Sequence, residues 1–460
     1  MWAVPRFKEA LVKTSTRSRI PLPAAAIAAV AMLTAARAGA QMRYYVDPVA
    51  GSNGNPGTAA FPLQTFGVAV SLAASNDEIV LMPGIYGAAN GETFPITIGS
   101  PNTQNNLLVR GLDGVVFDLG GSTVPALRLA SGANGLRITN ISFINSDQLG
   151  WWTRVIDSGT GVNSGNAANN VEIDRCRFAS VNRGMVLWTN DNVSGWRVHD
   201  NLFANMTNDA ILEYTGTNNQ FYNNTFYGNS YKAYISDSAT SLCYNNLIVN
   251  CAIGIECNNA ANNPARFQNN WIYQCPIAAQ GAGIVGRLPA SNSVGRDPLM
   301  VNPTAGDYHL QAGSPCIDAG HPGIFARMDL DAVSRIVDSD QNGSVLPEIG
   351  CHESSPVAMT AVFDPSLGVL LTSYTRTDPT VTGFVLFSLG EGLVPIPGGS
   401  PLLISPALYL GYLWSPTPTT WYVNLNPVLP FVAGTRVVTQ VVGIGLGPSL
   451  LGGNRVWTQF

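Results

Sequence analysis

Between Ile173 and Ile272 one six-residue motif occurs five times: IDRCRF (173–178), VHDNLF (198–203), FYNNTF (221–226), CYNNLI (243–248) and FQNNWI (267–272). Its first residue recurs every 22 to 25 residues, and an earlier copy at 138–143 fits the same alignment. A unit this short cannot form a core alone and must stack on its neighbours. The repeat therefore predicts a solenoid.

The apolar pattern between the motifs predicts that the stacked elements are strands. Seven and nine residues after each motif the chain has an apolar pair: Met185 and Leu187, Ala210 and Leu212, Ala233 and Ile235, Ile255 and Cys257. A period of two is typical of a strand with one buried face. Stacking in register makes these strands parallel and aligns Asn201, Asn224, Asn246 and Asn270 in one ladder at a turn. We predict an all-β chain built on a right-handed parallel β-helix.

Residues 1–40 have the composition of a secretory signal peptide. Arg6, Lys8, Lys13, Arg17 and Arg19 precede an apolar run over 24–36, and Ala38-Gly39-Ala40 offers a cleavage site before Gln41. The run is too short to span a bilayer, and the alternative is an uncleaved anchor or a disordered leader. We expect a secreted or cell-surface protein with no transmembrane span in the mature chain.

The mature chain would be acidic and poor in lysine. Without residues 1–40, 18 Lys and Arg face 28 Asp and Glu, a net charge of −10, and Lys232 is the only lysine. Nucleic-acid binding depends on many cationic contacts to phosphates. This composition argues against nucleic acid as a partner.

Residues 44–98, which include Glu92-Thr93-Phe94-Pro95-Ile96, suit a cap over the open end of the solenoid. This segment resembles the N-terminal domain of unknown function that heads many secreted bacterial β-helix proteins, and a similar opening occurs in family 9 pectate lyases. With the coils, the resemblance covers residues 44 to about 353. It implies an architecture, because the shared motifs position coils and carry no chemistry.

Two further segments follow the coils. Residues 308–353, with Gly313-Ser314-Pro315-Cys316 and Glu348-Ile349-Gly350-Cys351, resemble the closing segment of the same β-helix proteins, which implies a C-terminal cap. The composition changes at Ser354, and residues 354–460 alternate short apolar runs with Pro and Gly. That pattern predicts a small β-sandwich. We therefore divide the mature chain into a β-helix domain, 41–353, and a C-terminal domain, 354–460.

Seven cysteines in an exported chain suggest disulfides. Cys251 and Cys275 occupy one column on adjacent coils, and Cys316 and Cys351 could close the end of the domain. Cys243 and Cys257 fall in columns that point into the solenoid, so we expect them to be core residues. Cys176 would then have no disulfide partner. The alternative is that all seven are reduced.

Positions that alternate with the inward pairs should form a polar outer face. It would present Trp188, Asp209, Glu213, Tyr234 and Glu256 to a polysaccharide or cell-surface glycan. Trp151 and Trp152 lie on the long loop after Phe143. They either contact the same ligand or pack over one side of the solenoid.

The same face offers one basic pair for catalysis, Lys232 and Arg183. A polysaccharide lyase removes the proton beside a uronate carboxylate with a basic side chain. Against this role, Asp209 on the adjacent coil would keep Lys232 protonated, so a surface ion pair is the alternative. Family 9 lyases also use a cluster of Asp calcium ligands near the base, and this sequence has no matching cluster.

A separate calcium loop is predicted near the end of the β-helix domain. Asp338, Asp340 and Asn342, followed by Gly343, Ser344 and Glu348, supply oxygen ligands in an EF-hand-like order, although Glu348 comes one place early. The alternative is a turn rich in Asp, Asn and Gly.

Two functions are consistent with these features. One is an exported carbohydrate-active protein that binds a polysaccharide along the polar face and cleaves it by β-elimination if Lys232 acts as a base. The other is a non-catalytic surface or matrix protein, with the solenoid as a spacer and residues 354–460 as an adhesion module.

Overall fold

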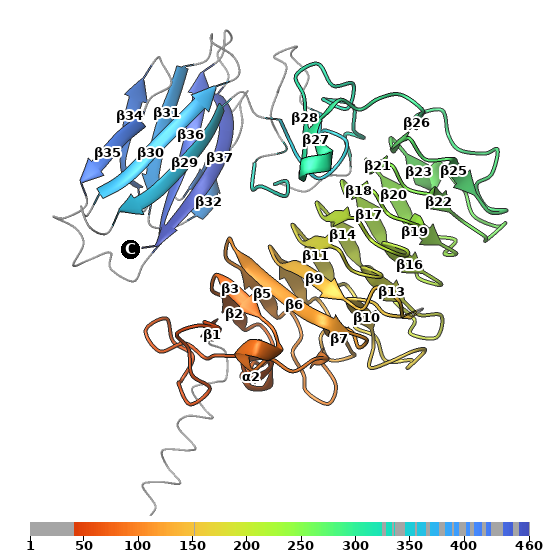
Figure 1. The fold of residues 1–460 in the computed structure, drawn as a ribbon, viewed down its shortest axis with the longest axis horizontal. Coiled ribbons are helices and arrows are strands. Elements are labelled where there is room, and N and C mark those ends of the chain that lie inside the picture. Colours follow the sequence, from red (N-terminus) through yellow and green to blue (C-terminus); the bar gives the residue numbers. More distant parts are fainter. Residues whose placement is uncertain are drawn as a thin grey trace, which may run out of the picture. The chain divides into compact units, whose positions relative to one another are not determined.

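The computed structural model describes residues 41–150, 152–323, 328–333, 335 and 346–354, together with the backbone of strands between 357 and 459. The predicted signal peptide, residues 1–40, lies outside the described residues. Within them, the chain from Arg43 to Val294 forms a parallel β-solenoid of three sheets (Figure 1). The predicted fold class is confirmed.

Each coil contributes one strand to each sheet. The first sheet contains β1 (Arg43–Val46), β2 (Glu78–Leu81), β5 (Leu108–Gly111), β8 (Arg137–Thr139), β11 (Glu172–Asp174), β14 (Arg197–His199), β17 (Gln220–Tyr222), β20 (Leu242–Tyr244) and β23 (Phe267–Gln268). The second contains β4 (Ile96–Ile98), β7 (Leu127–Leu129), β10 (Ile156–Ser158), β13 (Met185–Leu187), β16 (Ile211–Glu213), β19 (Lys232–Ser236), β22 (Ile253–Glu256) and β25 (Ile277–Gln280). The third contains β3 (Gly84–Tyr86), β6 (Val115–Ser122), β9 (Ser142–Ser146), β12 (Arg177–Ala179), β15 (Leu202–Ala204), β18 (Thr225–Tyr227), β21 (Leu247–Val249), β24 (Trp271–Tyr273) and β26 (Ser293–Val294).

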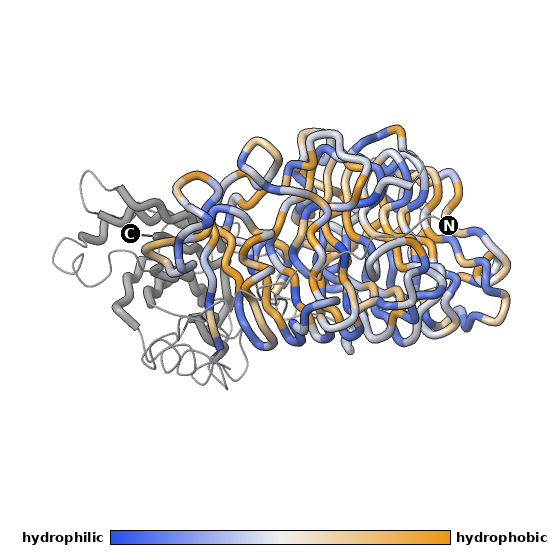
Figure 2. Tube along the Cα trace, turned by 90° about the horizontal axis from the view of Figure 1, so that it is seen from below, coloured by the Kyte–Doolittle hydropathy of each residue, from blue (hydrophilic) through white to orange (hydrophobic). Residues whose placement is uncertain are grey.

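The motif alignment matches the strand register. The first motif residues pair across neighbouring coils in the order Ile173, Val198, Phe221, Cys243 and Phe267. Their side chains, and those of the last motif residues, point into one apolar core. Figure 2 shows hydrophobic segments recurring coil after coil along the solenoid.

Phenylalanine rings stack through that core. The centroids of Phe178 and Phe203 lie 4.7 Å apart with nearly parallel planes, and Phe143 and Phe226 extend the stack at 5.1 and 5.0 Å. Offset stacks of this kind add to the stability gained by burial. The stack fixes the distance between coils from inside.

Paired asparagines explain the sharp turn between the first and third sheets. The first asparagine of each pair adopts a left-handed backbone, with φ of 51° at Asn223, 56° at Asn245 and 51° at Asn269. Asparagine tolerates that conformation better than most residues because its side chain bonds locally. The second asparagine of each pair forms the predicted ladder, which the structure extends to Asn292.

A short helix packs at the N-terminal end of the solenoid. Helix α2 (Phe66–Leu72) begins at Thr65, whose hydroxyl accepts a bond from the Val68 amide. Its buried residues Phe66, Ala69 and Val70 join the solenoid core. The helix lies at the N-terminal end of the stack (Figure 1).

The predicted C-terminal cap lies elsewhere. Strands β27 (Met300–Asn302) and β28 (Asp307–Leu310) form a hairpin. Together with Cys316, Leu330, Ile349 and Cys351, it packs against Leu202, Leu247 and Trp271 on the outer face of the third sheet. This closing segment therefore covers a side of the solenoid; the expectation that it closes the end is wrong. The outer surface of β15, β21 and β24 is apolar, and packing the closing segment on it removes that surface from water.

All seven cysteines are free thiols in the structure, so neither predicted disulfide is present. Cys251 and Cys275 lie beside each other as the alignment indicates, since their thiols are hydrogen-bonded. Each thiol also lies near a carbonyl of its own coil, Val249 and Tyr273 respectively. Cys243 and Cys257 are core residues, as expected.

The C-terminal residues form antiparallel sheets, in keeping with the predicted all-β domain. The strands are β29 (Val357–Asp364), β30 (Val369–Arg376), β31 (Thr382–Ser388), β32 (Glu391–Val394), β33 (Leu402–Ile404), β34 (Tyr409–Ser415), β35 (Thr420–Asn424), β36 (Arg436–Ile444) and β37 (Leu450–Gln459). They pair in the orders β29-β30-β35, β34-β31-β36-β37 and β32-β33.

Candidate functional site

The outer face of the second sheet carries a small apolar cluster of its own. Val186, Leu212 and Ile235 lie in register on β13, β16 and β19, and Trp188 joins them. Their neighbours in sequence, such as Ile211 and Tyr234, point the other way into the core. Both faces of the second sheet therefore carry buried apolar side chains.

This register reverses four of the predicted orientations. Met185 pairs with Ile211 rather than with Ala210, because the turn before β16 is one residue longer than the turn before β13. A shift of one residue sends a strand's side chains to the opposite face. Leu212 and Ile235, predicted inward, are on the outer face; Glu213 and Tyr234, predicted outward, are inside the solenoid.

Glu213 is consequently a structural residue. Its carboxylate is fully buried and accepts bonds from Asn219, Tyr234, Ser236 and Ser241 at 2.6–3.1 Å. Burial raises its pKa, although those donors act in the opposite direction. Neither Glu213 nor Tyr234 is placed to contact a ligand on the outer face.

Three ion pairs cross the outer face beside the apolar cluster. They are Arg154–Asp157 at 2.5 Å, Arg183–Asp209 at 2.9 Å and Lys232–Glu256 at 2.9 Å. All six side chains are at most 12% exposed. The structure thus brings together four predicted site residues, Lys232, Arg183, Asp209 and Glu256, but pairs each with an opposite charge.

Aromatic rings lie over these charges. The Trp152 and Trp188 centroids are 5.6 Å apart, and Trp188 stacks on Tyr214 at 5.8 Å. The Arg183 guanidinium lies 5.2 Å from the Trp152 ring, and the Arg154 guanidinium lies 5.1 Å from the Trp188 ring. Trp188 is buried, whereas Trp152 is 45% exposed. We call Trp152, Trp188 and Tyr214 the aromatic platform; Trp151 lies outside the described residues.

Some hydrogen-bonding capacity on this face is unused. Asp209 Oδ1, Arg128 Nε and Arg154 Nε are buried and make no hydrogen bond among the described residues. Arg128, on β7, belongs to the same face because it pairs in register with Asp157. Buried polar atoms in proteins are normally satisfied by protein, water or ligand. These atoms therefore suit bound water.

The charges on this face do not favour proton abstraction. Burial alone would lower the pKa of Lys232, but the ion pair with Glu256 and the charge of Asp209 outweigh it and raise that pKa. Burial raises the pKa of Asp209. A general base must be able to lose its proton near neutral pH. Lys232 is held in the protonated form.

The predicted calcium loop cannot be compared with the structure. Asp338, Asp340, Asn342 and Ser344 lie outside the described residues. Glu348 is described and is buried, and its backbone amide donates to Glu353 at 3.1 Å. Calcium at this loop stays a prediction.

A second charged cluster, on the first sheet, was missed by sequence reasoning. His199 is 3% exposed, contacts Asp200 at 2.6 Å and Glu172 at 3.5 Å, and stacks on Tyr222. Burial opposes protonation, yet the two carboxylates raise its pKa to about 9. Asp200 in turn binds Arg335 of the closing segment at 2.6 Å. Arg335 reaches this cluster from 135 residues further along the chain, and no local signal in the sequence indicates that contact.

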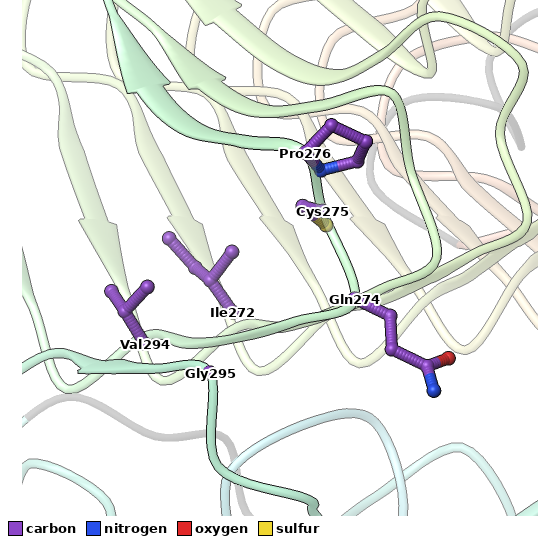
Figure 3. A pocket seen from close by; sticks show the side chains of 6 residues that line it. All are labelled: Ile272, Gln274, Cys275, Pro276, Val294 and Gly295. Atoms are coloured by element: carbon purple, nitrogen blue, oxygen red, sulfur yellow. The ribbon is translucent and has the colours of Figure 1, made fainter.

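One open pocket lies where the third sheet ends. It is lined by Ile272, Gln274, Cys275, Pro276, Val294 and Gly295 (Figure 3). Ile272 and Val294 form an apolar wall, and the Gln274 side chain points away from them. With no ionisable group but the Cys275 thiol, this pocket is poorly suited to acid–base chemistry.

Within the ranges that the structure describes, no helix has the length and apolarity needed to cross a bilayer.

Several solved structures share features of the fold at low similarity. A rhamnogalacturonan lyase is 15% identical, with a TM-score of 0.33, and the match covers 56% of this chain and 63% of that one. Pectate lyase Pel9A is 11% identical, with a TM-score of 0.37, and the match covers 70% and 98%. The lacto-N-biosidase of Eubacterium ramulus is 10% identical, with a TM-score of 0.32 and coverage of 59% and 70%. This chain thus spans less than two thirds of the rhamnogalacturonan lyase.

No curated protein matches the chain. A family model described as a protein of unknown function, DUF1565, matches residues 49–309, which is more than half of the chain and includes all the solenoid strands from β2 to β26. The chain belongs to the DUF1565 family.

Proposed function

We propose that this protein binds an extracellular polysaccharide along the outer face of the second sheet, without cleaving it. The observation that carries this proposal is the aromatic platform, whose exposed member Trp152 stands beside a row of charged side chains. Location outside the cell rests on the signal peptide predicted for residues 1–40.

The chemistry of the face suits sugar rings. A pyranose presents an apolar C–H surface and a rim of hydroxyls, so an aromatic ring can pack on the first while polar groups bond the second. Trp152 offers the ring, and the partly exposed polar ends of Lys232 and Glu256 offer groups that can bond hydroxyls. The face continues through Lys232 and Glu256, which suits an extended chain.

Binding fits this face better than elimination does. Lys232 is paired with Glu256, and Arg183 is paired with Asp209 beneath Trp152. A cation held in an ion pair can orient a carboxylate or hydroxyl but cannot accept a proton from carbon.

The test is binding of the purified chain to a panel of acidic and neutral polysaccharides by affinity electrophoresis and calorimetry. Trp152→Ala and Tyr214→Ala should each weaken binding to the best polymer by about 5- to 30-fold, equivalent to about 1–2 kcal/mol of stacking. Phe61→Ala is the matched control, because Phe61 is 60% exposed in the N-terminal loop, away from the second sheet.

Binding to no polymer, or binding that Trp152→Ala and Tyr214→Ala leave intact, would contradict the proposed site. The same mixtures, followed by the ultraviolet absorbance of unsaturated uronates, test the absence of cleavage. Product that disappears in Lys232→Ala would replace this proposal with a lyase.

A further inference from the structure

Three side chains on the closing segment converge on one point. His309 Nε2 lies 2.8 Å from Asp331 Oδ2, and His352 Nε2 lies 3.5 Å from the same oxygen. The two imidazole centroids are 4.2 Å apart. Each residue offers one ligand atom, and the three atoms lie within 4.8 Å of one another. Around a four-coordinate Zn²⁺ ion, such ligand atoms are about 3.3 Å apart.

Neighbouring groups orient two of the three ligands, His309 and Asp331. Asp307 Oδ1 lies 2.7 Å from His309 Nδ1 and also accepts the His309 backbone amide, which leaves Nε2 facing Asp331. Arg177 binds the other oxygen of Asp331 at 2.8 Å, which leaves Oδ2 facing the imidazoles. Carboxylates behind ligating histidines are the usual second shell of metal sites.

The donor set selects the class of metal. Two imidazole nitrogens and one carboxylate oxygen suit Zn²⁺, Co²⁺, Ni²⁺ or Cu²⁺, whereas Ca²⁺ prefers six to eight oxygens. His309 and Asp331 are about half and one third exposed, so an ion can reach them from solvent. Once His309 has given up its proton, Asp307 and Asp331 carry two negative charges against the one positive charge of Arg177, and that balance favours a cation.

We propose that His309, Asp331 and His352 form a Zn²⁺-class site that ties three parts of the closing segment together. His309 lies on β28, Asp331 in the turn at 328–333, and His352 in the segment 346–354. The metal replaces the proton shared by His309 Nε2 and Asp331, and that proton passes to solvent. Water completes the coordination. The site is distinct from the calcium loop predicted at 338–348.

The role of the site is structural. Metal bonds between segments that are 21 to 43 residues apart restrict the unfolded chain and stabilise the folded one. The three segments already pack on the third sheet through Tyr308, Leu330 and Ile349. The ion would fix the rim of that packed surface.

The experiment uses the full chain without a polyhistidine tag, stripped of metal with EDTA. Equilibrium dialysis against Zn²⁺ alone should show one bound ion per chain, and Co²⁺ should give a visible absorption spectrum typical of nitrogen and oxygen ligands. Saturating Zn²⁺ should raise the unfolding temperature. Calcium should not compete.

Variants identify the ligands. His309→Gln should weaken Zn²⁺ binding at least tenfold; because it also removes the contacts to Asp307 and Asp331, the metal-free variant is the reference for its own unfolding temperature. Asp307→Asn should weaken it about 10- to 100-fold through the orientation of His309. His321→Gln, a change of another histidine in the closing segment, should leave binding unchanged.

A wild-type chain that binds no Zn²⁺ would overturn the proposal, since the three residues would then form an ion-pair cluster only. Binding that His309→Gln and Asp331→Asn both retain would place the ion elsewhere and overturn it equally. Neither result bears on polysaccharide binding by the second sheet.

Discussion

Asn224 lies directly beside Asn246 of the next coil, although 22 residues separate them in sequence. The Asn224 backbone amide donates to Asn246 Oδ1 at 3.0 Å, and the Asn224 side-chain amide reaches the same oxygen at 3.1 Å. The Asn224 oxygen in turn accepts two bonds from Asn201, and its nitrogen donates to the Val198 carbonyl. One side chain therefore joins three successive coils.

Asn224→Ala should destabilise the solenoid by about 2–4 kcal/mol. The change leaves the Asn201 amide and the Val198 carbonyl buried without a partner, and each such group costs about 1–3 kcal/mol. The free energy of unfolding from urea titration measures this. Asn190→Ala is the control, because Asn190 is exposed. Equal stability of the two variants would contradict the role of the ladder.

The ladder could be predicted from sequence because it depends on local repetition. Each coil repeats the same motif, so residues one period apart must be neighbours once the strands stack in register. The left-handed turn at Asn223, Asn245 and Asn269 has the same origin, and the paired asparagines are its signal. Orientation on the second sheet was harder, because a turn one residue longer before β16 reverses Glu213 and Leu212 without disturbing the motif.

Arg335→Met should destabilise the protein by about 3–5 kcal/mol. Arg335 is fully buried and binds Asp200 and Glu353 at 2.6 Å each, so its loss leaves Glu353 buried without its cation and leaves Asp200 with His199 alone. The Gly350 carbonyl also loses a donor at 2.7 Å. Urea titration again gives the free energy of unfolding.

The matched control for Arg335 is Arg287→Met, whose side chain is exposed and whose change should stay within about 0.5 kcal/mol. If Arg335→Met unfolds at the same urea concentration as Arg287→Met, the closing segment does not depend on this ion pair.

Long-range contacts of this kind could not be predicted from the sequence. Arg335 meets Asp200 across 135 residues, and nothing periodic relates them. The same holds for Asp331 and Arg177, and for the apolar residues that draw the closing segment to the side of the solenoid. Leu202, Leu247 and Trp271 are fifth residues of the motif and form the outer surface that receives the segment, but nothing in the repeat identifies which part of the chain covers them.

His199 should make stability depend on pH between about 6.5 and 9. Asp200 and Glu172 overcome the effect of burial and raise its folded pKa to about 9, above the unfolded value of about 6.5. A raised pKa means that the folded state holds the proton more tightly, so this contribution is complete below pH 6.5 and is lost as the pH rises through 9. The whole shift corresponds to about 3 kcal/mol, most of which is lost between pH 6.5 and pH 9.

The measurement is the difference in unfolding free energy between the wild type and His199→Gln across that range. Hydrogen bonds to Asp331 and Asp307 raise the pKa of His309 to about 9 as well, and the difference cancels that contribution. The difference should shrink by about 2–3 kcal/mol from pH 6.5 to pH 9. A constant difference would show that His199 is neutral in the folded protein.

Lys232 should titrate above the ordinary lysine value of about 10.4. The Glu256 carboxylate at 2.9 Å and the charge of Asp209 stabilise its ammonium form more than burial destabilises it. The chain has only two other lysines, Lys8 and Lys13, so the ε resonances of ¹³C-labelled lysine can be assigned by a single Lys232→Arg variant. Glu256→Gln should lower the Lys232 pKa, because it removes the closest negative charge.

Asp237→Asn is the control for Glu256→Gln: it removes an acid from the same edge of the second sheet, yet Asp237 bonds the backbone of Asn258 rather than Lys232. Its effect on the Lys232 pKa should be small. A wild-type pKa near 7 would reverse the argument, since Lys232 would then be able to accept a proton at neutral pH, and elimination rather than binding alone would become the better account of this face.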